Sequence, residues 1–450
     1  MIQDGHYACK THRNDHRCHA ARIRFRADAP QRARAAGQVI PLAPTYLRAM
    51  CLNRIFFSLT AAVLLSFAAR AQQIPILTDS ARISLITCGP GNELYSSFGH
   101  TAIRVYDPLQ GIDYTYNYGT FDFDQPNFYL NFARGNLLYM LSVGHYRNFV
   151  RVYRNENRSV HEQYLRLDAD QKQALFEFVE WNAEPENSSY PYDYFFDNCS
   201  TRPRDVIAQA LGEQLVWDSS YVDHHRSIRS MCDDYILRTQ PWGDLGIDIC
   251  LGSRIDRPST AWEHTYLPYE LERAVDHAYV RVGDSILPLV SRKWDVVVPE
   301  PTENEVGWFA PQPVFVAVLL VVAMLVTFMR MGGWFAGYVE GTVFFLTGLL
   351  GLLLAFLWFG TSHATAAWNL NLAWAVPTDL VFALALFRRQ RPTWVRWYAV
   401  FMLVLCALPL IFWGMLPQML HYSLRFIVIL KMFLALGIFR TWSSGMGKSI

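Results

Sequence analysis

Hydrophobic positions divide this chain into a long N-terminal part with short alternating runs and a C-terminal third with long apolar stretches. Five of these stretches are long enough to span or nearly span a bilayer: 313–330, 340–360, 372–388, 395–414 and 424–440. Basic residues gather at one end of them, which the positive-inside rule makes cytoplasmic: Arg330, Arg388, Arg389, Arg391, Arg396, Arg440 and Lys448. The pattern predicts an all-α transmembrane bundle of about five helices over 313–450, joined by a linker at 301–312.

The part before the linker combines strand and helix patterns. ARISLITC predicts a strand, and HTAIRVYD with DYTYNYGTF predicts a β-hairpin that turns at 108–111. The aromatic runs NFYLNF, NLLYMLSVG and FVRVYR are interpreted as further strands or strand-like loops. Apolar residues at helical spacing predict one helix after Asp168 and a second from around Cys199 to Gly212. We therefore expect an α+β domain over 72–300.

The beginning of the chain resembles an extension followed by an export signal. Residues 1–49 are rich in Arg and His without a periodic apolar face, so we expect them to be disordered and to precede the true start of translation at Met50. Residues 50–71 have a basic start, an apolar core and a small-x-small cleavage site, which together predict a signal peptide. An uncleaved anchor helix is the alternative. The α+β domain is then exported.

Composition supports a membrane protein and gives no sign of nucleic-acid binding. Of the 450 residues, 52% are hydrophobic and the formal net charge is +1. Four cysteines fall in the exported domain, where disulfides are permitted: Cys88, Cys199, Cys232 and Cys250. The favoured bridge joins Cys232 to Cys250, while a free Cys88 could lie near Cys199.

The candidate chemistry is a thiol and an imidazole, with the histidine first in the chain. Cys199 is expected at a helix N-terminus, where the helix dipole lowers a thiol pKa, and His100 at a strand start can act as its base. Asn117, on the returning strand of the hairpin, is the candidate to orient His100. The structural alternatives are a disulfide or a buried thiol at Cys199, and a simple turn at Asn117.

Two further groups of residues have weaker signals. His363, Asn369 and Asn371 lie in a polar segment between two predicted spans, on the same side as the exported domain, and are interpreted as a substrate-binding group. The stretch DHHRSIRSMCDD at 223–234 contains metal-ligand residue types, but its spacing matches no zinc pattern and it is interpreted as a solvated loop. No metal and no cofactor are predicted.

Three blocks occur in order: ISLITCGPGNELYSSFGHTAIRVYD, YNYGTFDF and YDYFFDNCSTRPRD. With the later SHATAAWNLNLAW, they resemble the Lnb family, the lipoprotein N-acyltransferases of Bacteroides-type bacteria. The resemblance covers everything from the signal peptide onward. It implies a circularly permuted papain-like fold, similar to permuted NlpC/P60 domains, with Cys199 and His100 as the catalytic pair.

The resemblance also implies an activity, a location and partners. The enzyme would sit in the bacterial inner membrane with its N-terminal domain in the periplasm. It would move an acyl chain from a phospholipid to the N-terminal amine of a lipoprotein through a Cys199 thioester, with the oxyanion met by backbone N–H groups at the helix start. Two alternatives remain open: a membrane-tethered cysteine peptidase or amidase acting on the cell wall, and a non-enzymatic membrane receptor or assembly factor.

Overall fold

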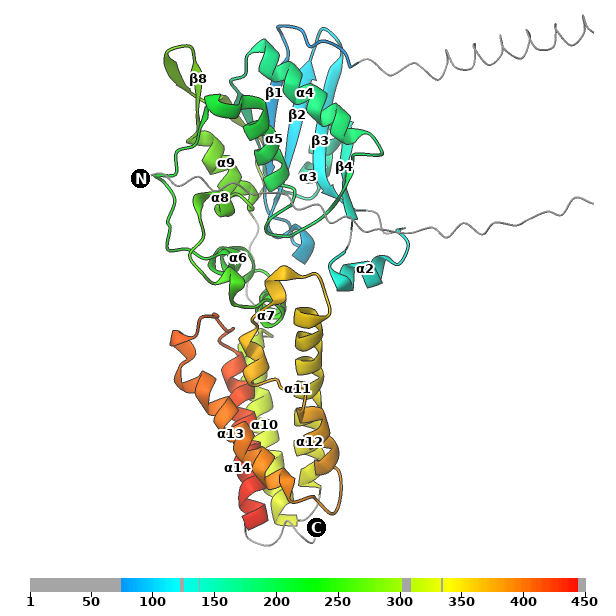
Figure 1. The fold of residues 1–450 in the computed structure, drawn as a ribbon, viewed down its shortest axis with the longest axis vertical. Helices are drawn as coiled ribbons and strands as arrows, with labels where there is room; N and C mark the ends of the chain where they lie inside the picture. The colour runs from blue at the N-terminus through cyan, green and yellow to red at the C-terminus, as the bar shows by residue number, and fades with distance from the viewer. Residues whose placement is uncertain (1–73, 122–124, 137, 302–308, 333–334, 444–450) are drawn as a thin grey trace, which may run out of the picture. The chain divides into compact units, whose positions relative to one another are not determined.

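A computed structural model describes residues 74–121, 125–136, 138–301, 309–332 and 335–443 (Figure 1). The structure is α+β, with a sheet-rich N-terminal part followed by a helical C-terminal part, as predicted. The predicted extension at 1–49 and signal peptide at 50–71 lie outside the described residues. So does most of the predicted linker.

The exported part is built on a seven-stranded antiparallel sheet of order β10-β5-β1-β2-β3-β4-β6. The predicted strand and hairpin are confirmed as β1, β2 and β3, and Gly111 (φ +68°) lies at the turn between β2 and β3. The bounds of the strands are β1 Arg82–Cys88, β2 His100–Asp107, β3 Ile112–Thr120, β4 Leu138–His145, β5 Val160–Leu165, β6 Ser189–Pro191 and β10 Val290–Val297.

Helices cover both faces of this sheet. Apolar residues of α4 (Ala169–Ala183), α5 (Thr201–Leu211) and α9 (Pro268–Asp276) share one core with alternate residues of β1 and β2. The other face carries α3 (Tyr146–Asn155), which packs against Ile86 and Cys88 of β1. The predicted helix after Asp168 is confirmed, since the Asp168 side chain accepts a hydrogen bond from the Gln171 N–H in a capping box.

Two of the three aromatic runs are helices rather than strands. NLLYMLSVG supplies β4 as predicted, but NFYLNF forms α2 (Phe128–Arg134) and FVRVYR lies in α3. In α3 only Val150 and Tyr153 are buried, three positions apart, which is one face of a helix. Tertiary contact therefore overrides the β-propensity of the aromatic and branched residues.

Residues 215–288 contain, besides α9, a small helical layer and a second sheet. The sheet order is β7-β8-β9, from Leu215–Val216, Tyr279–Val282 and Ser285–Pro288. The helices are α6 (Ile228–Ile236), α7 (Pro241–Cys250) and α8 (Ala261–His264). The loop interpretation of 223–234 is wrong for its second half, because Ser227 caps α6 and the helix buries residues such as Met231 and Cys232.

The predicted disulfide is also wrong. All five cysteines in the described ranges are free, and the Cys232 Sγ lies 3.2 Å from the Tyr266 hydroxyl in a buried contact. Cys250 ends α7 on a different helix. Sequence separation alone could not show that the two cysteines belong to separate packing environments.

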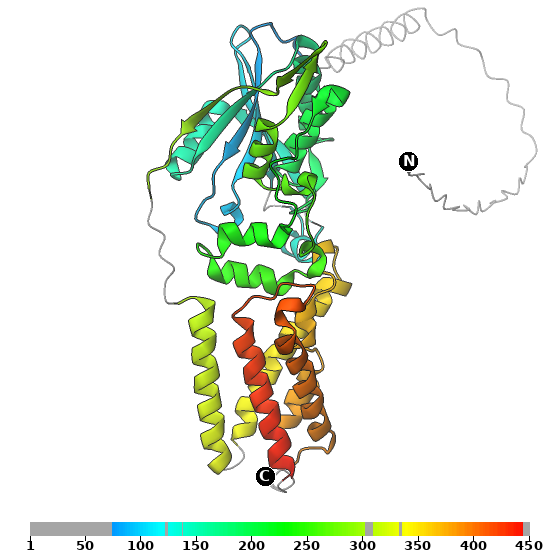
Figure 2. The same cartoon turned by 90° about the vertical axis from the view of Figure 1, so that its left-hand side faces the viewer.

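The C-terminal part has helices in all five predicted regions, running alongside one another (Figure 2). They are α10 (Pro311–Gly332), α11 (Ala336–Phe359), α12 (Asp379–Leu386), α13 (Trp394–Ile411) and α14 (Leu424–Ser443). Among the described residues, α10, α11 and α13 are long and apolar enough to cross a membrane. Only eight residues of the third predicted span are helical in α12, and α14 contains three basic residues, so the five-span count stays a prediction.

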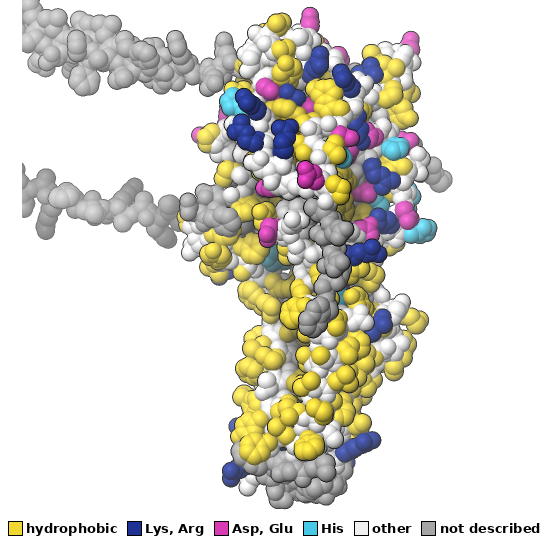
Figure 3. All heavy atoms as spheres, turned by 180° about the vertical axis from the view of Figure 1, so that it is seen from behind, with side chains coloured by type: hydrophobic (Ala, Val, Ile, Leu, Met, Phe, Trp, Pro, Cys, Tyr) yellow, Lys and Arg dark blue, Asp and Glu magenta, His cyan; other side chains and the backbone are white. Residues whose placement is uncertain are grey.

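The surface follows the same division. Hydrophobic side chains cover the helical part, whereas charged side chains gather on the sheet-bearing part (Figure 3).

Inside the bundle, Lys431 and Asp379 form an ion pair with both side chains fully buried. Arg330 and Glu340 form a second pair, at 2.6 Å.

Candidate active site

His100 is positioned by the first hairpin of the sheet. It begins β2 and lies opposite Cys88 of β1 in the strand register. Gly99 precedes it with a φ of +82°, and a Cβ there would lie 2.6 Å from the Cys88 carbonyl oxygen. The glycine is therefore required for the close approach of the two chains at the point where the imidazole emerges.

Asn117 orients the imidazole. Its side-chain oxygen is hydrogen-bonded to His100 Nε2 from the neighbouring strand β3. Because an amide oxygen can only accept, the Nε2 carries the ring proton and the lone pair of a neutral His100 lies on Nδ1. Among the described residues Nδ1 has no hydrogen-bond partner, so it remains available as a base. The structure thus brings together these two predicted site residues.

Cys199 lies beside the start of β2. The backbone N–H of Thr101, the residue after His100, lies close enough to lower the pKa of the Cys199 thiol. The neighbouring Ser200 hydroxyl contacts the Thr101 hydroxyl at 3.4 Å. On the β3 side, Gly119 (φ +85°) is so close that an added Cβ would lie 3.1 Å from the Cys199 Cβ. All three predicted catalytic residues therefore line one end of the β2–β3 hairpin.

The helix start behind the thiol is already occupied. The Asn198 side-chain oxygen accepts hydrogen bonds from the N–H groups of Ser200 and Thr201, at 2.8 and 2.9 Å. N–H groups at this helix start are the ones predicted from the sequence to stabilise an oxyanion, and these two are not free to do so. The backbone N–H of Cys199 remains beside its own thiol, whose pKa it lowers. Asn198 instead fixes the turn that presents the thiol.

Burial decides the charge state of the pair. It raises the pKa of the Cys199 thiol to about 11, against the opposing effects of the Thr101 and Cys199 N–H groups and of Arg158. It lowers the pKa of His100 to about 4, although the bond to Asn117 acts in the opposite direction. Both groups are neutral at neutral pH. Burial therefore opposes the lowering of the thiol pKa that a helix N-terminus favours.

Two residues near the thiol had no signal in the sequence. The buried guanidinium of Arg158 donates from Nε to the Gly89 carbonyl at 2.9 Å and lowers the pKa of Cys199. Thr101 contributes only its backbone, which no side-chain pattern can reveal. Cys88 is fully buried and free, and it lies close enough to Cys199 for a charge on that thiol to raise the pKa of Cys88, as its place near the hairpin suggested.

Aromatic rings connect the thiol to α2. The Tyr192 ring lies beside Cys199 and Gly119 and stacks on Tyr139, with ring centroids 4.0 Å apart. Tyr139 contacts Phe121 at 5.4 Å, and Phe121 contacts Phe128 at the start of α2 at 6.4 Å. We call these four residues the aromatic wall: Tyr192, Tyr139, Phe121 and Phe128.

The α2 helix buries none of its residues and exposes several large apolar ones, including Tyr129 at 82% and Phe132 at 58%. It contacts the segment that follows α11. The Ser362 N–H donates to the Arg134 carbonyl at 2.8 Å, and His363 Nε2 lies 3.2 Å from the Phe132 carbonyl. Because α11 ends only three residues earlier, α2 lies at the level of a predicted membrane boundary. His363 therefore contacts the C-terminal end of α2.

The two asparagines predicted with His363 lie elsewhere. Asn369 and Asn371 are buried, and their amide groups donate to backbone carbonyls at the end of α7. The Asn371 side-chain oxygen accepts from the indole of Trp374. These contacts give them a role in holding α7 against the helical part. Their predicted substrate-binding role has no support from this geometry.

The fold and site define a membrane protein whose exported α+β domain places a thiol, an imidazole and an amide together, ahead of a helical membrane region. The family model of the Lnb N-terminal periplasmic domain matches residues 73–231, and that of the Lnb transmembrane domain matches residues 302–443. The chain belongs to the Lnb family and is a membrane protein with a periplasmic domain. No curated protein and no solved structure matches the chain.

Proposed function

We propose that this protein is a lipoprotein N-acyltransferase of the bacterial inner membrane. It transfers an acyl chain from a phospholipid to the N-terminal amine of a diacylglyceryl-cysteine lipoprotein. The observation that carries the proposal is the grouping of Cys199, His100 and Asn117 at one end of the β2–β3 hairpin, connected by the aromatic wall to an exposed apolar helix. The histidine precedes the cysteine in the chain, which fits a permuted papain-like arrangement.

The first half of the reaction forms a thioester. His100 Nδ1 takes the thiol proton as the Cys199 sulfur attacks an ester carbonyl of the phospholipid, and the new S–C bond replaces the C–O bond. The N–H of Cys199 stabilises the oxyanion. His100 then returns the proton to the alkoxide of the departing lysophospholipid. Because the resting pair is neutral, proton transfer accompanies the attack.

The second half consumes the thioester. The lipoprotein amine attacks the carbonyl, so that an N–C bond forms as the C–S bond breaks. His100 accepts the amine proton and delivers it to the departing Cys199 sulfur, which restores the neutral pair. Asn117 holds the imidazole in the tautomer that both steps require.

The exposed face of α2 supports a lipid donor. Its apolar side chains lie beside the end of α11, where they can enter the outer part of the bilayer. The aromatic wall gives an acyl chain a continuous apolar surface toward the thiol. A peptide of the cell wall would not need such a surface.

The test is lipoprotein acylation in cells that lack their own N-acyltransferase. Expression of this chain should convert diacylated lipoproteins to triacylated ones by mass spectrometry, and Cys199→Ala should abolish the conversion. Cys250→Ala is the matched control, because that cysteine is also partly exposed but distant in the fold, and it should remain active. Triacylation by the Cys199→Ala variant, or cleavage of cell-wall peptide without triacylation by the parent, contradicts the proposal.

A further inference from the structure

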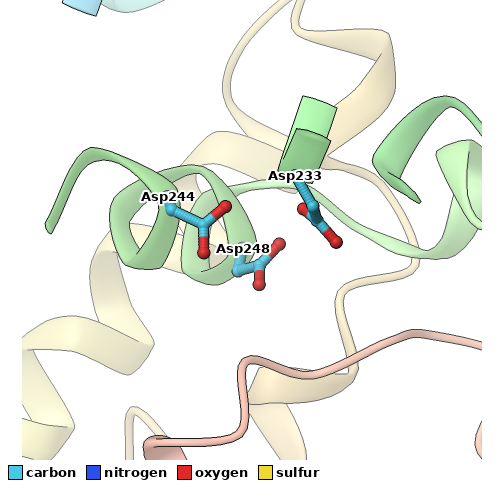
Figure 4. A group of neighbouring side chains, drawn as sticks. All are labelled: Asp233, Asp244 and Asp248. Atoms are coloured by element: carbon cyan, nitrogen blue, oxygen red, sulfur yellow. The ribbon is translucent and has the colours of Figure 1, made fainter. Parts of the chain in front are cut away.

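Three carboxylates meet in the helical layer of the exported domain, away from the thiol. Asp244 and Asp248 lie on successive turns of α7, and Asp233 projects toward them from α6 (Figure 4). One oxygen of each lies within 4.8 Å of the others. We call these residues the acidic cluster. Like charges this close repel one another unless a cation or protons balance them.

The protein supplies little positive charge to balance the cluster. Arg229 is fully buried and donates to Asp248 at 2.6 Å, but it also pairs with Asp256 at 2.8 Å. Among the residues that line the adjoining cavity, Arg425 is the other guanidinium. Four carboxylates, counting Asp256, therefore face two guanidinium groups.

Two buried polar atoms at the cluster have no hydrogen-bond partner among the described residues. They are Asp244 Oδ1 and His421 Nε2, whose side chains are 2% and 1% exposed. His421 reaches the cluster from the segment before α14, with Nε2 3.3 Å from Asp244 Oδ2. The Ser423 N–H donates to His421 Nδ1, so Nε2 carries a proton and faces the carboxylate. His421 Nε2 therefore faces Asp244 Oδ2 without forming a hydrogen bond, and Asp244 Oδ1 is free to bind a ligand.

The cluster also opens to a space large enough for a hydrated ion. A cavity of about 500 Å³ is lined by all three carboxylates and by the segment before α14, including Trp413 and His421. Buried polar groups that have no hydrogen-bond partner and face a polar cavity are usually satisfied by a bound water or ion.

We propose that the acidic cluster binds a divalent cation, preferring Ca²⁺ to Mg²⁺. Ca²⁺ binds carboxylate oxygens at about 2.4 Å, so its ligands lie up to about 4.8 Å from one another, and the three oxygens of the cluster all lie within that span. Waters in the cavity complete the coordination. Mg²⁺ seldom uses a cage made mainly of protein carboxylates.

The cation would fix the helical layer of the exported domain to the membrane part. Asp256 accepts from the Met419 N–H at 3.0 Å, and Gln418 donates to the Leu251 carbonyl at 2.9 Å, both beside the cluster. An ion held by α6 and α7 removes the repulsion that opposes this contact. The site is independent of the proposed acyl transfer, because its ligands lie outside the thiol site.

Terbium luminescence tests the proposal on the full chain in detergent. Tb³⁺ occupies calcium sites, and Trp413 beside the cavity can sensitise its emission. Saturable emission that Ca²⁺ displaces is expected, and Asp244→Asn should weaken Tb³⁺ affinity by about tenfold or more, through loss of a charged ligand. Asp234→Asn, a neighbouring exposed acid paired with Arg226, is the matched control and should keep the parent affinity.

Thermal unfolding gives a second readout that does not depend on luminescence. Ca²⁺ should raise the melting temperature of the parent and of Asp234→Asn but leave Asp244→Asn unchanged. If Asp244→Asn does not fold, Asp233→Asn replaces it. The proposal is overturned if Asp244→Asn keeps full Tb³⁺ affinity. It is also overturned if the parent ignores Ca²⁺ and is stabilised instead by acidification, since protons would then balance the cluster.

Discussion

The two parts of this molecule bury ionisable groups in opposite ways. In the exported domain, Cys199 and His100 share a site in which burial favours the uncharged form of each. In the helical part, Lys431 and Asp379 are fully buried as an ion pair, and the Lys431 ammonium also donates to the Trp374 carbonyl. Tyr398 donates to the same carboxylate at 2.9 Å.

The difference follows from what each set of groups has to do. A paired and hydrogen-bonded charge is fixed, because removing either partner leaves the other uncompensated in a medium of low polarity. A neutral thiol and imidazole can exchange a proton when an acyl carbonyl binds. No ion pair has to be separated before the reaction begins. The ion pair therefore suits a scaffold, and the neutral pair suits a site whose charges appear only during reaction.

The largest expected effect concerns the pH dependence of Cys199 labelling. With the thiol pKa raised to about 11, the thiolate fraction rises about tenfold per pH unit below that value. Alkylation should accelerate about a thousandfold between pH 6 and pH 9, measured by mass spectrometry of the Cys199 peptide. An alkylation rate that stays constant across this range would show that the resting pair is a thiolate and an imidazolium. The two parts of the molecule would then both bury charged groups. Cys232, which is 1% exposed, should remain unlabelled.

Removing one partner of the buried ion pair should be the next largest effect. Lys431→Met leaves the Asp379 carboxylate uncompensated and should lower the free energy of unfolding by about 3 kcal/mol or more. Denaturant titration in detergent measures the change. The double variant Lys431→Met/Asp379→Leu should recover most of it, because no charge then remains unpaired. Equal stability of the parent and the single variant would mean that the pair does not hold the bundle.

Changing Asn117 alters the neutral site itself. Asn117→Ala should slow acyl transfer by about 10- to 100-fold, since His100 loses the bond that sets its tautomer. Asn117→Asp keeps an acceptor and adds a negative charge, which should raise the His100 pKa and flatten the labelling profile at low pH. Full activity in Asn117→Ala would exclude an orienting role.

The sequence predicted the local features of the fold better than its long-range ones. Asp168 marks a helix start through its own side chain, and the hairpin turn at Gly111 needs only neighbouring residues. The edge strand β10 pairs with β5 from more than a hundred residues away, so no local pattern could indicate it. The helix α2 was predicted as a strand because its aromatic residues are typical of strands.

The same limit applies to the site. Cys199, His100 and Asn117 could be named from their residue types and from the hairpin, and the structure places them together. The charge states of these residues could not be predicted from the sequence. They depend on the degree to which segments distant in the chain bury each side chain. The occupation of the helix N–H groups by Asn198, and the gathering of Asp233 with Asp244 and Asp248, likewise arise only when the chain is folded.

The smallest expected effect isolates the contact between β3 and the thiol. Gly119→Ala and Gly111→Ala both place a side chain at positive φ, at a similar cost of about 1–2 kcal/mol in stability. Only Gly119→Ala adds a methyl group against the Cys199 Cβ, whereas Gly111 has open space around it. We expect Gly119→Ala to slow Cys199 alkylation severalfold at fixed pH, and Gly111→Ala to leave it unchanged. Equal alkylation rates in the two variants would place the accessible face of the thiol away from β3, and the neutral pair would then have to receive its acyl group from the side of Thr101.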